Sequence, residues 1–194
     1  MKRIFSLSGT LFAALALMTG SLYAAENAPA PASPAMQHGS LDRKDHEFLK
    51  KAAEINLTEI ELGKIAERVS SDPNIKKIAG TIVKDHTAAN QKLERLAASK
   101  GVSLPMEPSI WDRHSLNVMQ KEQGEKFNKE FLAFNLKGHE KAIALFEKEA
   151  SRVKDPDIKA WAQKTLPELR QHLAMAQSGK PEAVAEKAKQ QKHW

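Results

Sequence analysis

Three histidines and one glutamate occupy positions where an amphipathic helix normally carries apolar residues. In residues 74–96, apolar side chains recur in alternating steps of four and three, the pattern of a buried helix face, yet position 86 is histidine. The same rhythm in three other segments has Glu59, His139 and His172 as its strongly polar member. An ionisable group is costly to bury unless it is paired or bound to metal. The pattern therefore predicts that Glu59, His86, His139 and His172 together bind one metal ion.

The four residues fall at similar heights along their predicted helices. Each lies roughly 12–17 residues from the turn of its own hairpin, or about 18–26 Å at 1.5 Å per residue. Three imidazoles and one carboxylate suit zinc, iron or manganese, and also copper if Met175 joins them. The metal's identity stays open at this point. The alternative is a buried hydrogen-bonded network that only sets the register of the helices.

Four long helices must position these residues. Asp42 is a plausible N-cap for the first helix, and Ser71 or Asp72, followed by Pro73, opens the second. The second ends near Gly101, the third begins near Phe127, and Asp155 with Pro156 opens the fourth, which ends near 178–179. No segment alternates with period two, so no strand is predicted.

The connection over residues 102–126, with a short helix expected within 109–120, is long enough to run the length of such helices. We therefore predict an all-α, ferritin-like four-helix bundle of two long antiparallel hairpins, with this long connection between the second and third helices.

The chain ends differ from the predicted bundle. Residues 1–24 carry Lys2 and Arg3, then an apolar run and small residues, which is typical of a secretory signal peptide. Residues 25–40 form a Pro/Ala-rich linker, 41–178 the bundle, and 179–194 a polar flexible tail. We expect a periplasmic protein whose mature chain has no transmembrane segment. Nothing in the sequence supports association with the outer membrane.

Composition narrows the functional classes. Loss of Lys2 and Arg3 with the signal peptide takes the formal net charge from +6 to +4, and no basic block is interleaved with aromatic residues, so nucleic acid is not an expected partner. The chain has no cysteine, which excludes thiol chemistry. The sequence also departs from the di-iron carboxylate pattern, because no glutamate stands three residues before any of the histidines at 86, 139 and 172. A di-iron oxidase that uses a tyrosyl radical is excluded, because Tyr23 is lost with the signal peptide and is the chain's one tyrosine.

These observations favour an exported bundle that binds a metal ion for buffering or stress protection. Two alternatives stay open, a structural or interaction protein and a mononuclear metalloenzyme, so enzymatic activity is undecided.

Four segments carry a resemblance to a known family: DHEFLKKAAEINLTEIELGKIAE, IAGTIVKDHTAANQKLERLA, KFNKEFLAFNLKGHEKAIALFEKEA and LPELRQHLAMA. Over about residues 41–177 the chain resembles the exported bacterial family called domain of unknown function 4142, whose members are grouped with ferritin-like bundles and often labelled outer-membrane proteins. The positions that match the family's usual pattern are Glu59, Asp85, His86, His139, Pro167 and His172. The resemblance implies the fold and export, and the family's activity is not established.

Overall fold

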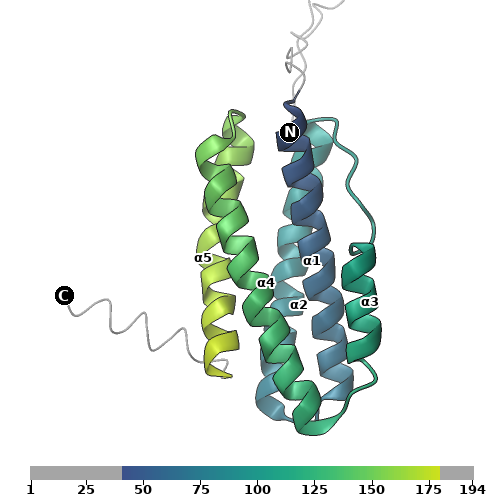
Figure 1. The fold of residues 1–194 in the computed structure, drawn as a ribbon. Coiled ribbons are helices and arrows are strands. Elements are labelled where there is room, and N and C mark those ends of the chain that lie inside the picture. The colour runs from purple at the N-terminus through teal and green to yellow at the C-terminus, as the bar shows by residue number, and fades with distance from the viewer. Residues whose placement is uncertain (1–40, 180–194) are drawn as a thin grey trace, which may run out of the picture. The chain divides into compact units, whose positions relative to one another are not determined.

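The computed structural model describes residues 41–179, which form five helices and no strand (Figure 1). The helices are α1 (Arg43–Val69), α2 (Pro73–Ser99), α3 (Ile110–Met119), α4 (Gly124–Arg152) and α5 (Pro156–Ser178). The predicted all-helical class is confirmed for this part of the chain. The expected signal peptide (1–24), the linker (25–40) and the tail beyond residue 179 lie outside the described residues.

Aspartate side chains begin three of the long helices. Asp42, Asp72 and Asp155 each accept a hydrogen bond from a backbone N–H of the first turn that follows. Pro73 and Pro156 occupy the first helical positions, where a missing N–H costs nothing. The helix starts predicted at these three aspartates are confirmed.

The start of α4 is the boundary that the sequence pattern misplaced. The helix begins at Gly124 rather than near Phe127, and its N-cap residue, Gln123, makes no side-chain capping bond. Gly124 has a φ of 60°, a conformation that glycine adopts without strain. Because this start carries no capping side chain, the sequence held no signal for it.

The four long helices pack in two antiparallel pairs, α1 with α2 and α4 with α5 (Figure 1). α1 also contacts α4, and α2 contacts α5, while the short α3 lies against α1 and α4. The segment between α2 and α4 runs along the molecule and carries α3 (Figure 1). Ion pairs join the two hairpins: Arg152 to Asp45 at 2.9 Å and Lys100 to Asp155 at 2.8 Å.

The buried apolar residues form two clusters, one toward each end of the helices. The first includes Phe48 and Phe146, and the second includes Leu62 and Phe131. On each long helix the residues of the two clusters are separated by the polar position that broke the apolar pattern. This polar level consists of Glu59, His86, His139 and His172.

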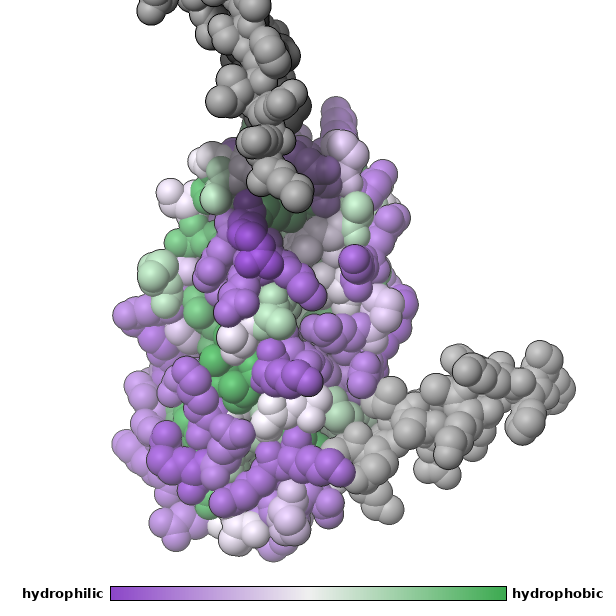
Figure 2. Space-filling view, turned by 180° about the vertical axis from the view of Figure 1, so that it is seen from behind, coloured by the Kyte–Doolittle hydropathy of each residue, from purple (hydrophilic) through white to green (hydrophobic). Residues whose placement is uncertain are grey.

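The outer faces of the four long helices are mostly hydrophilic, while α3 exposes Ile110, Trp111 and Val118. Viewed from behind, the surface is mostly polar with small apolar areas between the charged side chains (Figure 2). Within residues 41–179, none of the helices combines the length and the apolar character that crossing a membrane requires.

Candidate metal centre

Three histidines from three helices meet at the polar level. His86 comes from α2, His139 from α4 and His172 from α5, and their side chains are at most 1% exposed. One nitrogen of each ring lies within 4.8 Å of a nitrogen of the other two. The Nε2 atoms of His86 and His139 are 3.4 Å apart. The three histidines could therefore coordinate one metal ion.

Each ring has its other nitrogen next to an oxygen that accepts hydrogen bonds. Nδ1 of His86 is 3.0 Å from Oδ1 of Asn56, and Nδ1 of His139 is 2.9 Å from the backbone carbonyl of Asn135. Nε2 of His172 is 3.1 Å from Oδ2 of Asp85. Since these oxygens can only accept, a neutral imidazole at each position would place its single proton on the nitrogen that faces them.

This arrangement leaves one nitrogen of each histidine without a proton. The bare nitrogens are Nε2 of His86, Nε2 of His139 and Nδ1 of His172, and the last has no hydrogen-bond partner among the described residues. The lone pairs of the two Nε2 atoms, which are 3.4 Å apart, repel one another. A cation among them would turn this repulsion into attraction. Outer hydrogen bonds that fix the ring and its tautomer are the usual surroundings of metal-bound histidine.

Burial keeps the rings of His86 and His139 neutral. Desolvation lowers the pKa of His86 well below its ordinary value, and the neighbouring His172 and His139 lower it further. Desolvation and the neighbouring His172 lower the pKa of His139 to about 4. Because a metal binds the neutral imidazole, protons do not compete for these two nitrogens near neutral pH.

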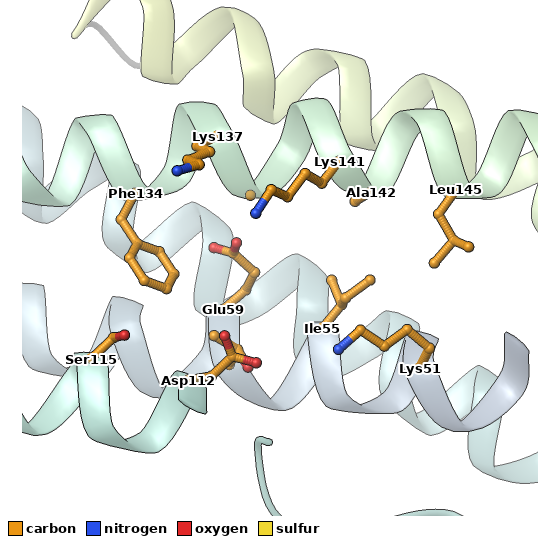
Figure 3. Close-up of a pocket in the computed structure, with 12 residues that line it drawn as sticks. Lys51, Ile55, Glu59, Asp112, Ser115, Phe134, Lys137, Lys141, Ala142 and Leu145 are labelled. Carbon is orange, nitrogen blue, oxygen red and sulfur yellow. The ribbon is translucent and has the colours of Figure 1, made fainter. Parts of the chain in front are cut away.

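Glu59 lies at the same level but outside the three-histidine group. Its Oε1 is 3.8 Å from Nδ1 of His139, the nitrogen on the side of the ring away from His86. Its Oε2 is buried without a partner, and burial, with a smaller contribution from Asp112, raises the pKa of Glu59 to about 8. Glu59 also lines a pocket of about 480 Å³ between α1, α3 and α4, with Asp112, Lys137 and Lys141 around it (Figure 3).

The residues that orient the histidines were missed in the sequence. Asn56 and Asn135 are polar and lie beside the predicted apolar stripes, while Asp85 directly precedes His86 and points toward a different helix. The contact of Asp85 is with His172 on α5. Polar residues one position or about one turn from Glu59, His86 and His139 in their own helices were the available signal.

Comparison with known proteins places the chain in a family and a fold. No curated protein matches it. Among solved structures it is similar to the crystal structure of a DUF305 fragment from Deinococcus radiodurans, with 13% identity and a TM-score of 0.63 over 71% of this chain and 95% of that chain. That likeness concerns the fold alone. The family described as domain of unknown function DUF4142 matches residues 30–178, so this chain belongs to the DUF4142 family.

Proposed function

We propose that this protein is an exported, periplasmic ferritin-like four-helix bundle that binds one transition-metal ion at His86, His139 and His172. The observation that carries the proposal is the set of three bare, buried nitrogens, each fixed by an oxygen on the far side of its ring. A core built only for stability gains nothing from ring nitrogens that are buried without a donor, since buried acceptors without donors cost free energy.

The spacing of one pair of nitrogens fits a metal ion. Zinc–nitrogen bonds of about 2.0–2.1 Å at tetrahedral angles put two ligand nitrogens about 3.3–3.4 Å apart. The separation of 3.4 Å between the Nε2 atoms of His86 and His139 matches this value. Imidazole ligands suit zinc, copper and iron, and these three lead the candidates, with manganese favoured less by nitrogen donors.

A fourth coordination position remains beyond three histidines. Glu59 as the fourth ligand stays a prediction, because its carboxyl group faces the outer side of His139. A water molecule or a small anion is the alternative occupant. Enclosure of the ring nitrogens favours a firmly held ion, and this supports metal retention for buffering or stress protection over rapid turnover of a substrate.

The test is metal stoichiometry with matched histidine variants. The metal-free mature protein is titrated with cobalt(II), whose visible absorption reports the coordination geometry, and with zinc by calorimetry. We expect one bound ion per chain for wild type and none at this site for His86→Gln.

The control is His114→Gln, which alters an exposed histidine on α3 and should leave the stoichiometry unchanged. A wild-type protein that takes up no cobalt, zinc, copper or iron would reject the proposal and favour the structural network.

A further inference from the structure

A metal ion needs a path to the three histidines, because their side chains are enclosed. His86 and His139 are 1% exposed and His172 is 0% exposed. An ion from solvent must therefore pass other groups first. The question is which side of the molecule offers such groups.

The pocket between α1, α3 and α4 reaches from the surface to the neighbourhood of His139. Glu59, only 3% exposed, is its most deeply buried acidic lining residue, and its Oε1 lies 3.8 Å from Nδ1 of His139. Asp112 on α3 lines the same pocket nearer the solvent (Figure 3). The carboxyl groups of Asp112 and Glu59 thus lie one after the other in space between the solvent and His139.

The carboxyl group of Glu59 has a free oxygen and space beside it, so it can bind a metal ion. Its Oε2 has no hydrogen-bond partner although it is buried, which is a costly state for an oxygen acceptor. Opposite it, α4 carries Gly138, where an added Cβ would stand 3.0 Å from Oε1. Gly138 therefore leaves space beside the carboxyl group of Glu59, and any larger residue at this position would reduce that space.

We propose that this pocket is the access route of the metal ion and that Glu59 is a transient ligand that transfers the ion to His139. This inference rests on the proposed metal-binding function. The imidazole of His139 stands between Glu59 and the other two histidines, so it must turn aside during passage and release its hydrogen bond to the carbonyl of Asn135. An ion held by Glu59 at that moment stays coordinated throughout.

Two lysines at the same pocket should slow the entry of a metal cation, whereas the carboxyl groups should favour it. Lys137 and Lys141 line it from α4, and neither has an ion-pair partner among the described residues. Their positive charges repel an incoming cation. The rival route passes Asp85 and Glu168, between α2 and α5. Lys84 and Lys92 are near Asp85, and Lys92 is also near Glu168. Removal of single charges on each side therefore distinguishes the two routes.

The experiment measures cobalt(II) uptake by stopped-flow absorption and cobalt release into excess chelator, at low ionic strength, with metal-free full-length mature protein. A group that binds the ion only during passage lowers the barrier in both directions. We expect Glu59→Gln to slow uptake and release by the same factor, about tenfold or more, while the Kd changes less than about threefold. Lys141→Gln should speed uptake about two- to fivefold, and Lys92→Gln should not.

The following results would overturn the proposed route or the proposed role of Glu59. Glu59→Gln with unchanged rates, or acceleration by Lys92→Gln instead of Lys141→Gln, overturns the route. A Kd weakened mainly through faster release identifies Glu59 as a permanent ligand and also overturns the inference. A wild-type protein that binds no cobalt overturns the metal-binding function itself, which is a separate result. The exposed Lys141 tolerates substitution, so the test does not depend on the folding of the Glu59 variant.

Discussion

The three histidines differ in the oxygen that accepts their outer proton. His86 faces the neutral amide of Asn56 and His139 a backbone carbonyl, whereas His172 faces the carboxylate of Asp85. The hydrogen bond from His172 is the main cause that lowers the pKa of Asp85, so this carboxylate is ionised at neutral pH. A negative partner makes the other ring nitrogen more electron-rich, and therefore we expect His172 to be the strongest metal ligand of the three.

Asp85→Asn tests this role at the level of one residue. The amide keeps the size of the side chain and an accepting oxygen but loses the charge, so metal affinity should fall by about 10–100-fold with stoichiometry unchanged. Competition with a chromophoric chelator measures the affinity. Asp157→Asn, at an exposed carboxylate near the start of α5, is the control and should leave the Kd within error. Equal affinities for the two variants would show that Asp85 does not tune His172.

At the scale of elements, the sequence predicted most of what local chemistry controls. The capping aspartates and the short helix in residues 109–120 followed from turn signals, and both are present. In α4 the buried residues include Phe131 and Asn135, whereas the neighbouring Leu132 and Leu136 are only partly buried. A search for apolar periodicity does not select a helix face that contains a polar asparagine. The face that this half of α4 turns toward the core could therefore not be predicted from the sequence.

The partners of the histidines were unpredictable for a related reason. Asn56 and Asp85 act on rings that belong to other helices, 30 and 87 residues away in sequence. Helical periodicity shows which face of a helix is buried and at what height, but it does not show which side chain of a neighbouring helix stands opposite. The heights of the histidines were therefore predictable, while the oxygens that fix their tautomers needed the structure.

Close packing of α1 on α2 gives a prediction for the elements themselves. A Cβ at Gly63 would lie 2.5 Å from Cγ2 of Val83 and 3.1 Å from the carbonyl oxygen of Ala79. Gly63→Ala must push the helices apart and should destabilise the protein by about 1–3 kcal/mol. Gly80→Ala is the matched control on α2, since its Cβ would meet only the flexible end of Glu67.

Chemical denaturation of both alanine variants compares the two sites. Gly80→Ala should be neutral or gain up to about 1 kcal/mol from helix propensity. If Gly63→Ala were equally stable, the helices would not be in contact at Gly63.

For the whole molecule, the polar level makes stability depend on pH in two opposite ways when metal is absent. The pKa of Glu59 is raised to about 8, so the folded state holds a proton that the unfolded state releases above about 4.5, and this group lowers stability as pH rises. The pKa values of His86 and His139 are lowered, so the unfolded state binds more protons below about 6.5, and these groups lower stability as pH falls. The stability of the metal-free fold therefore decreases both above and below an optimal pH.

His139 allows the acid side of this balance to be measured. Its pKa of about 4 in the folded state lies below the ordinary value of 6.5, so acidification from pH 7 to about 4.5 should remove on the order of 2–3 kcal/mol of unfolding free energy through this residue. Urea denaturation with a chelator present gives the unfolding free energy at both pH values.

His139→Leu cannot take up a proton in the unfolded state, so its loss of stability on acidification should be smaller than that of wild type by this amount. His114→Gln, at an exposed position, should retain the wild-type dependence. If wild type and His139→Leu lost equal stability between pH 7 and 4.5, the imidazole of His139 would not be held neutral by burial, and the lone pairs on which the metal centre depends would not be preformed.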